Sequence, residues 1–162
     1  MRKAAVLFLA TGFGLGYSPL VPGTVGSVPG VVLGFCMNAL PGGPLPLWAQ
    51  IGIIVALVVA AVPLCDAAES LLGRIDDRRI VADEYTTFPI CMLGLPWTPW
   101  VVLMAFVTCR IMDIVKPPPA RQLQGLAGGL GIVADDVMSS LYSLALNHAA
   151  YAVIVRYVIH RG

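Results

Sequence analysis

Residues 110–119 carry charged side chains at spacings that could hold an anion. The segment reads Arg-Ile-Met-Asp-Ile-Val-Lys-Pro-Pro-Pro and follows a long apolar stretch. On a helix, Arg110 and Asp113 share one face, and Lys116 lies one further turn along. The three prolines prevent the helix from continuing. Two cations and an anion are thus held at the end of a rigid element, either as a structural ion pair at a helix end or as part of a functional site.

Two pairs of adjacent carboxylates, Asp83-Glu84 and Asp135-Asp136, stand beside apolar stretches. Adjacent carboxylates that are drawn into an apolar interface repel each other unless a cation lies near them. The second pair also has a structural explanation, because it falls in the first turns of an expected helix, where the helix dipole stabilises anions. That explanation does not account for every carboxylate cluster adjoining the mouth of an expected helix, so we interpret both pairs as candidate site residues.

Residues 9–27 are rich in glycine, proline and hydroxyl side chains. They read Leu-Ala-Thr-Gly-Phe-Gly-Leu-Gly-Tyr-Ser-Pro-Leu-Val-Pro-Gly-Thr-Val-Gly-Ser. Glycine allows the backbone to approach a ligand closely and to turn its N–H groups towards an anion. The same composition also fits a turn-rich loop at a membrane surface, so the pattern is weak evidence on its own. Thr24 precedes an apolar run and is placed to cap the helix that follows.

The composition is that of an integral membrane protein. Hydrophobic residues make up 58% of the 162 residues, charged residues make up 12%, and the mean hydropathy is +0.85. Soluble domains contain about 25% charged residues. The length suits a single domain over 1–162, and the formal net charge of +1 gives no reason to expect a nucleic-acid partner. The four cysteines lie in apolar runs without paired spacing, which predicts core thiols and neither zinc nor disulfides.

The candidate residues need helices that bring distant segments to one side of a membrane. We therefore expect an all-α fold, a polytopic membrane helical bundle with an interfacial site. The strongest predicted span is 47–65, about 19 residues without a charge, and 25–40 is predicted to form a hairpin with it. Two further helices, about 80–95 and 99–116, would be joined by a turn and return the second charged segment to the side of the first. One broken span would instead place the two segments on opposite sides.

Charge along the chain predicts which side faces the cytoplasm. Short arginine-rich loops prefer the cytoplasm, and both residues 74–79 and the Arg2-Lys3 terminus fit that preference. Within the loop, Asp-Asp-Arg-Arg at 76–79 is predicted to be solvated. The apolar stretch 137–159 is predicted to be the last membrane segment.

Taken together, the motifs resemble those of the phosphatidylglycerophosphatase A family of bacterial inner membranes. They are Ala-Thr-Gly-Phe-Gly at 10–14, Pro-Gly-Thr-Val-Gly-Ser at 22–27, Ile-Val-Ala-Asp-Glu at 80–84, the segment 110–119, and Gly-Gly-Leu-Gly-Ile-Val-Ala-Asp-Asp at 128–136. Each motif alone is weak, but their order and spacing over about residues 9–145 are specific. The chain departs from the family pattern at 85–89, where Tyr-Thr-Thr-Phe-Pro replaces a valine-rich run and a glycine. This departure leaves the packing beside the substrate open.

The resemblance implies an all-helical fold and Mg²⁺-dependent hydrolysis of phosphatidylglycerophosphate in the bilayer to phosphatidylglycerol and phosphate. A phosphate monoester is a dianion and needs cations, and Mg²⁺ takes carboxylate ligands while keeping several waters. The predicted metal ligands are Asp83, Glu84, Asp113, Asp135 and Asp136. The predicted catalytic residues are Asp83, Glu84, Asp113, Lys116 and Asp136. The predicted substrate-binding residues are Thr11, Gly12, Gly14, Gly23, Thr24, Ser27, Arg110 and Lys116.

No Cys-x5-Arg, Asp-x-Asp-x-Thr or histidine-based phosphatase signature occurs in the chain. We therefore expect metal-activated water to attack the phosphorus directly. The resemblance further predicts a multi-pass protein of the bacterial inner membrane with its active site facing the cytoplasm. Three alternatives stay open: a phosphatase for another lipid phosphate, a lipid phosphotransferase, suggested by Asp-Ala-Ala-Glu at 66–69, and a non-enzymatic membrane scaffold with structural acids.

Overall fold

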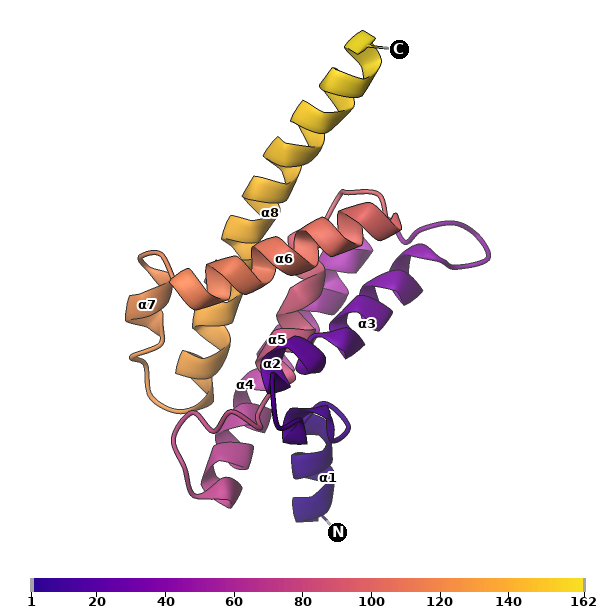
Figure 1. Ribbon diagram of the computed structural model, residues 1–162. Coiled ribbons are helices and arrows are strands. Elements are labelled where there is room, and N and C mark those ends of the chain that lie inside the picture. Colours follow the sequence, from indigo (N-terminus) through magenta and orange to yellow (C-terminus); the bar gives the residue numbers. More distant parts are fainter. Residues whose placement is uncertain (1, 162) are drawn as a thin grey trace.

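The computed structural model describes the backbone of residues 2–161 and the side chains of residues 3–157. The helices in chain order are α1 (Arg2–Ala10), η1 (Leu15–Tyr17), α2 (Pro22–Gly26), α3 (Val28–Asn38), α4 (Leu47–Leu72), α5 (Ala82–Thr87), η2 (Phe88–Met92), α6 (Pro99–Val115), α7 (Ala120–Leu123) and α8 (Gly129–Arg161). Every regular element within this described part of the chain is a helix, which confirms the predicted all-α class (Figure 1).

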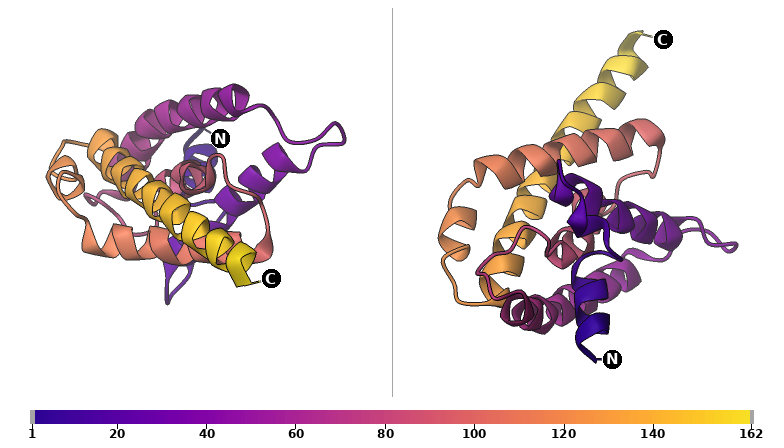
Figure 2. Two further views of the ribbon diagram at one scale, coloured as in Figure 1. Left: turned by 90° about the horizontal axis from the view of Figure 1, so that it is seen from above. Right: turned by 60° about the horizontal axis from the view of Figure 1, so that its bottom comes forward.

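The short helices α5 and η2 form the centre of the molecule, and longer helices surround them. Both views of Figure 2 show α5 among α3, α4, α6 and α8. Phe88 and Met92 of η2 each expose only 1% of their surface, so this segment is protein core and does not face lipid. The helix predicted at about 80–95 is found in a shorter and divided form, as α5 over 82–87 and the 3-10 helix η2 over 88–92. The Thr87 hydroxyl donates to Asp83 O at 2.7 Å, and Pro89 supplies no N–H, so the helix tightens into a 3-10 turn.

Within the part of the chain that the structure describes, two helices are long and apolar enough to cross a membrane by length and composition, α4 and residues 129–157 of α8. Helix α4 confirms the helix predicted at 47–65 and extends it to Leu72. Trp48 and Val59 of α4 expose 77% and 64% of their surface, and such exposed apolar side chains in a row are typical of a face against lipid. The multi-pass arrangement itself stays a prediction.

The membrane-length helix predicted at 25–40 is wrong. The segment divides into α2 and α3, and α3 has 11 residues, whereas a span needs about 20. Helix α3 ends where the Asn38 side-chain amide donates back to Gly34 O at 2.9 Å, just before the Pro-Gly-Gly-Pro turn. In contrast, α6 confirms the helix predicted at 99–116 to within one residue.

Helix α8 begins at Gly129, earlier than the apolar stretch predicted at 137–159, and its C-terminal turns extend beyond the other helices (Figure 1). The early start places Asp135 and Asp136 inside the helix, in its second turn. Their carboxylates are therefore held by a long rigid element that also reaches across the bundle.

The sequence predicts that residues 76–79, in the loop between α4 and α5, are solvated. The structure shows that this prediction is wrong for Asp77. Asp77 exposes only 3% of its surface, and its carboxylate accepts hydrogen bonds from the Arg79 guanidinium at 2.8 and 2.6 Å. The hydrogen bond from Arg79 lowers the pKa of Asp77 to about 2. This ion pair, between a buried carboxylate and a half-buried guanidinium, fixes the loop directly before Asp83 and Glu84.

Candidate active site

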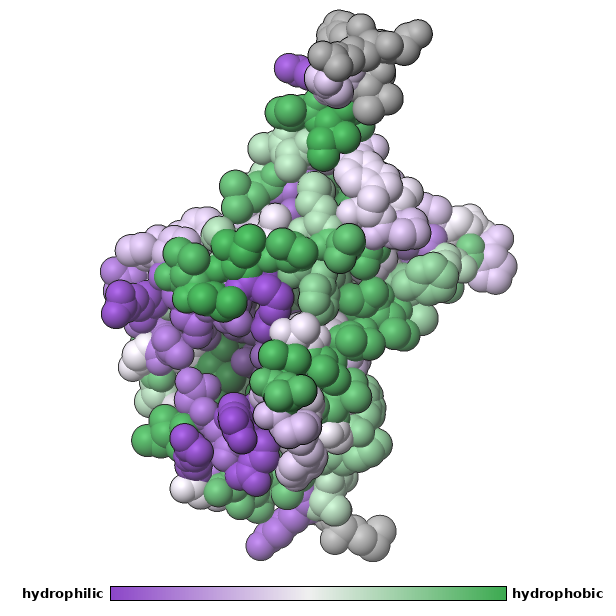
Figure 3. Space-filling view, viewed as in Figure 1, coloured by the Kyte–Doolittle hydropathy of each residue, from purple (hydrophilic) through white to green (hydrophobic). Residues whose placement is uncertain are grey.

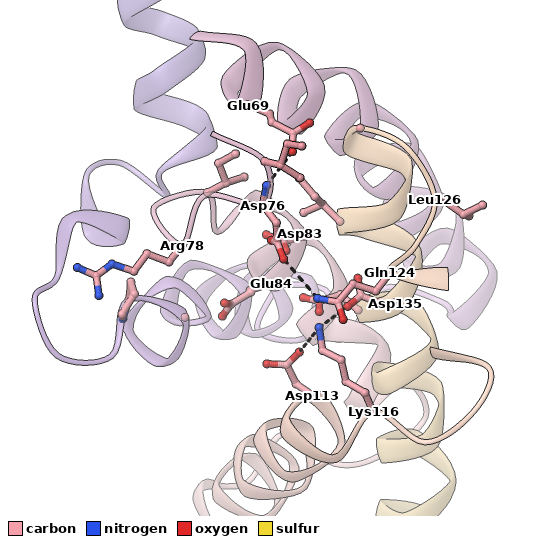
Figure 4. A pocket seen from close by; sticks show the side chains of 17 residues that line it. Glu69, Asp76, Arg78, Asp83, Glu84, Asp113, Lys116, Gln124, Leu126 and Asp135 are labelled. Atoms are coloured by element: carbon pink, nitrogen blue, oxygen red, sulfur yellow. Dashed lines mark hydrogen bonds and ion pairs between the residues drawn. The ribbon is translucent and has the colours of Figure 1, made fainter. Parts of the chain in front are cut away.

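One polar pocket of about 210 Å³ lies where α2, α5 and the ends of α4, α6 and α8 meet. Figure 3 shows hydrophilic side chains around a hollow on this face, bordered by apolar surface. Figure 4 shows acids from different helices pointing towards one another in the pocket. The predicted residues that line it are Gly23, Asp83, Glu84, Asp113, Lys116, Asp135 and Asp136. The turn between η2 and α6 thus returns the two charged segments to the same side.

Asp83 and Glu84 occupy the first turn of α5 and are largely buried. Asp83 Oδ1 is buried without any hydrogen-bond partner, and burial together with the charge of Glu84 raises the pKa of Asp83 well above its usual value. Burial also raises the pKa of Glu84, to about 7, against the opposing charge of Arg110. Ser27 donates to Glu84 Oε2 at 3.1 Å, which orients that carboxylate. The first turn of α5 therefore presents two carboxylates in a place that penalises negative charge.

Helix α6 supplies the charged triplet at its C-terminal end. Arg110 Nη1 lies 3.1 Å from Glu84 Oε2 and 3.3 Å from Asp113 Oδ2, which confirms that Arg110 and Asp113 share a face. The helix ends at Lys116, whose backbone adopts the left-handed conformation with φ 44°. Lys116 Nζ lies 2.5 Å from Asp135 Oδ2 and 3.9 Å from Asp113 Oδ1. The ammonium group therefore links α6 to α8.

The two carboxylates of α8 differ in their partners. Asp135 exposes 2% of its surface and accepts the hydrogen bond from Lys116. Asp136 exposes 7% and, among the described side chains, pairs with no cation. Burial lowers the pKa of Lys116, but the hydrogen bond from its ammonium to Asp135 and the charge of Asp135 outweigh this, so that the pKa is raised. Lys116 is therefore charged at neutral pH, and Asp136 and Asp83 are left without a neutralising partner.

The glycine-rich and hydroxyl-rich segment reaches the pocket through α2 and not through its first half. A Cβ atom at Gly23 would lie 2.2 Å from Glu84 Oε1 and 2.9 Å from Arg110 Nη1, so any larger residue would have to displace these two side-chain ends. Thr11 is completely buried, and its hydroxyl donates to Leu7 O at 2.7 Å. Gly12 and Gly14 have φ values of 57° and 95° and shape the turn after α1. Of the substrate-binding residues predicted in this segment, only Gly23 lines the pocket. Those that do not are Thr11, Gly12, Gly14, Thr24 and Ser27.

The pocket also contains polar residues that the sequence did not single out as site residues, namely Glu69, Asp76, Arg78 and Gln124. Glu69 Oε1 accepts the Asp76 N–H at 2.7 Å, and Gln124 Nε2 donates to Asp76 Oδ2 at 3.3 Å. Glu69 shares a face of α4 with Asp66, a spacing visible in the sequence. The other three lie in loops or next to them, where periodicity gives no signal.

The donor set suits a hard divalent cation, although the side chains do not form a closed ligand set as they stand. Among residues 3–157, no three acidic, histidine or cysteine side chains lie close enough together to hold a metal ion. The partnerless Oδ1 of Asp83 and the unpaired carboxylate of Asp136 are nevertheless oxygen donors in need of a cation. Carboxylates without thiolate or imidazole favour Mg²⁺ or Ca²⁺ over zinc.

Known proteins are similar to this chain over most of its length. The phosphatidylglycerophosphatases A of Escherichia coli and Haemophilus influenzae are 36% and 35% identical to this chain over 141 and 151 residues. These matches cover 85% and 89% of this chain and 78% and 90% of those proteins. A Bacteroides thetaiotaomicron protein provisionally named a phosphatidylinositol-3-phosphatase is 34% identical over 160 residues, which is 95% of this chain and 99% of that protein.

A comparison of the chain with protein families identifies the same family as the relatives from Escherichia coli and Haemophilus influenzae. No solved structure matches the chain. The pattern of phosphatidylglycerophosphatase A matches residues 8–151, which include every residue that we predicted for the site. The chain therefore belongs to the phosphatidylglycerophosphatase A family of phosphatases.

Proposed function

We propose that this protein hydrolyses the phosphate monoester of phosphatidylglycerophosphate, releasing phosphatidylglycerol and inorganic phosphate, with Mg²⁺ as cofactor. The observation that carries the proposal is the charge balance of the pocket. Seven carboxylates line it against the two cations Arg78 and Lys116, and a third cation, Arg110, pairs with two of these carboxylates, which leaves a formal excess of four negative charges. The carboxylates are those of Glu69, Asp76, Asp83, Glu84, Asp113, Asp135 and Asp136. A dianionic phosphate would be repelled from this pocket unless a divalent cation offset the carboxylates.

The metal ligands in this proposal are Asp83, Glu84, Asp113, Asp135 and Asp136. Bound Mg²⁺ would supply charge neutralisation and polarisation of a phosphoryl oxygen. Arg110 orients two of these carboxylates, because its guanidinium bonds to both Glu84 and Asp113. Ser27, which directly follows α2, restrains Glu84 by donating a hydrogen bond to its carboxylate.

The phosphate would be held by Lys116 and by the backbone around Gly23. Lys116 provides a charged donor at the end of α6, and charge-assisted hydrogen bonds to phosphate are about twice as strong as neutral ones. The missing side chain at Gly23 lets the backbone of α2 come within contact distance of Glu84 and Arg110. The backbone of α2 at Gly23 would therefore form one wall of the phosphate site, beside Glu84 and Arg110.

The nucleophile in this proposal is water. The described residues that line the pocket include no cysteine, serine, threonine or histidine side chain. The attacking water would form the new bond to phosphorus while the bond between phosphorus and the glycerol oxygen breaks. The proton lost by the water would return to the glycerol oxygen, so the products are an alcohol and inorganic phosphate.

The lipid substrate would reach the pocket from the bilayer that α4 and α8 are fitted to cross. The arginines of residues 74–79 lie at the same end of the bundle as the pocket, and arginine-rich loops favour the cytoplasm. We accordingly propose that the protein lies in a bacterial inner membrane with the pocket facing the cytoplasm.

The test is an assay of purified protein in neutral detergent with phosphatidylglycerophosphate, with and without Mg²⁺. We expect release of inorganic phosphate that stops in EDTA and returns when Mg²⁺ is added. Full activity after EDTA treatment would refute the proposed requirement for Mg²⁺. Phosphate release without any acceptor alcohol distinguishes hydrolysis from phosphotransfer, and absence of release would favour a scaffold.

The Bacteroides relative supplies a second candidate substrate, phosphatidylinositol 3-phosphate. It shares with phosphatidylglycerophosphate a phosphate monoester on a headgroup that is attached through a phosphodiester. The two substrates should be compared at equal concentration in the same micelles. The larger kcat/KM identifies the preferred headgroup.

A further inference from the structure

A second polar cleft, of about 360 Å³, adjoins the pocket. It lies between η1 with the residues after it and the loop that joins α4 to α5. Its lining residues are Gly16, Tyr17, Ser18, Pro19, Arg74, Asp77, Arg78 and Arg79. A Cβ atom at Gly16 would lie 2.1 Å from Arg79 O, so the two walls are packed tightly at the base of the cleft. The cleft is thus a formed feature between two packed segments.

The charges in this cleft are only partly neutralised. Asp77 is its one acid, and its carboxylate is fully engaged by the Nε and Nη2 atoms of Arg79. Arg74 and Arg78 form no ion pair with any carboxylate among the described side chains, and both are exposed. The cleft therefore presents two free guanidinium groups, whose planar donors match the oxygens of a phosphate.

Arg78 connects the cleft with the pocket, because it lines both. In Figure 4 its guanidinium points away from Asp83, Asp113 and Lys116. A group bound by Arg78 would therefore lie beside the acidic pocket and outside its metal-binding carboxylates. The two cavities can hold two parts of one ligand.

The surroundings of the cleft fit a lipid headgroup better than a soluble anion. Tyr17 exposes 54% of its surface, Leu20 exposes 87%, and Ile75 exposes 86%. Tyr17 lines the cleft, Leu20 directly follows the lining residue Pro19, and Ile75 follows Arg74 in the loop that forms the other wall. Large exposed apolar groups next to cationic ones are typical of a surface that lies at the headgroup level of a bilayer.

We propose that Arg74 and Arg78 bind the phosphodiester of the lipid substrate while its phosphate monoester occupies the acidic pocket. This inference rests on the proposed function, because it assigns the second phosphate of the same substrate. Phosphatidylglycerophosphate and phosphatidylinositol 3-phosphate both carry a phosphodiester between the headgroup and the diacylglycerol. Phosphatidic acid has only a monoester, so it can fill the pocket but not the cleft. The cleft thereby selects lipids with two phosphates.

The test compares Arg74→Gln and Arg78→Gln with Arg121→Gln, which removes an exposed arginine of α7 outside both cavities. KM and kcat are measured in neutral detergent micelles with phosphatidylglycerophosphate and with phosphatidic acid. We expect each cleft variant to raise KM for phosphatidylglycerophosphate about tenfold with little change in kcat, since a charged hydrogen bond is lost. KM for phosphatidic acid should not change, and Arg121→Gln should behave as wild type.

Two further experiments complete the test. The first shows whether the phosphodiester in the cleft belongs to the substrate or to a neighbouring lipid, and the second tests binding in the cleft independently of the proposed activity. If the cleft bound a neighbouring anionic lipid, the variants would differ from wild type only after phosphatidylserine is added to the micelles. Thermal unfolding with added phosphatidylglycerol requires no turnover. Phosphatidylglycerol should raise the Tm of wild type and Arg121→Gln but not of Arg78→Gln. Equal KM increases on both substrates, unchanged KM values, or equal Tm shifts in all proteins would overturn the assignment.

Discussion

Two buried aspartates near the pocket should respond oppositely to the same substitution. Asp83 has a carboxylate oxygen without a partner, whereas Asp77 is held by Arg79. Burial, followed by the charge of Glu84, raises the pKa of Asp83 well above its usual value. Its charge therefore destabilises the metal-free fold. Asp83→Asn removes the charge and keeps the size of the side chain, so we expect the metal-free variant to be more stable than wild type.

The size of the gain follows from the cost of an unsatisfied charged group, about 1–3 kcal/mol. For a domain of this length, each kcal/mol moves Tm by about 2–4 °C. The unfolded chain ionises Asp83 near about pH 3.9, and the folded protein does so at higher pH. Wild type therefore loses stability as pH rises above that value, and the Tm advantage of Asp83→Asn should widen from about pH 5 to about pH 8.

Asp77→Asn is the matched control with the opposite sign. The hydrogen bond from Arg79 lowers the pKa of Asp77 to about 2, so ionised Asp77 stabilises the fold. That stability is present above about pH 4 and is lost as pH falls towards about 2. At neutral pH, Asp77→Asn should lower Tm. Thermal unfolding in detergent with EDTA measures both variants.

Adding Mg²⁺ tests the role of Asp83 as a ligand in the same experiment. A cation at one hundred times its Kd stabilises a folded protein by about 2.7 kcal/mol. Wild type should gain this stability, Asp77→Asn should gain it too, and Asp83→Asn should gain much less. The reasoning is refuted if Asp83→Asn lowers Tm in EDTA, or if Mg²⁺ stabilises all three proteins equally.

Three further predictions concern the same pocket. Lys116→Arg should fold and insert normally but lose most activity, and Lys116→Ala should lose about a hundredfold in kcat; near-normal turnover of the alanine variant would return Lys116 to a structural role. Gly23→Ala should reduce kcat about a hundredfold, because its Cβ displaces Glu84 and Arg110, whereas Gly52→Ala, which meets no atom within 4 Å, should remain active. With the exposed native cysteine replaced, an impermeant thiol reagent applied to intact cells should label Gly42→Cys but not Gln122→Cys; labelling of the latter contradicts a cytoplasmic pocket.

The sequence predicted best where a rigid helix carries the residues. Arg110, Asp113 and Lys116 follow one another at helical spacing, and α6 holds them as expected. The two adjacent acid pairs were predicted because charges are rare in an apolar chain. Their convergence in one pocket depended on the fold returning both segments to one side, and the sequence left that point open.

The sequence predicted least well where backbone turns replace helices. Residues 88–95, which contain η2, carry no charged side chain, so hydropathy could not distinguish protein core from lipid contact there. The orientation of the Thr11 side chain could not be predicted from the sequence either. Its hydroxyl donates to the backbone of α1 and does not face the pocket. Arg78 belonged to a loop that looked solvated. Its position between two cavities depends on the ion pair of Asp77 and Arg79, which holds the loop on either side of it.

The end of α6 at Lys116 departs from a local rule, and this departure supports the functional role that we propose for Lys116. Helices commonly end with glycine in the left-handed conformation, and α4 follows this rule at Gly73, with φ 68°. Helix α6 ends in the same conformation at Lys116, with φ 44°. A side chain with a Cβ is strained there by about 1 kcal/mol, which glycine would avoid. The strained lysine does what glycine could not: its ammonium reaches Asp113 and, across the pocket, Asp135 of α8. Strain at Lys116 and an unpaired buried carboxylate at Asp83 are both unfavourable for folding, and their occurrence in one pocket is what the proposed binding of metal and phosphate there predicts.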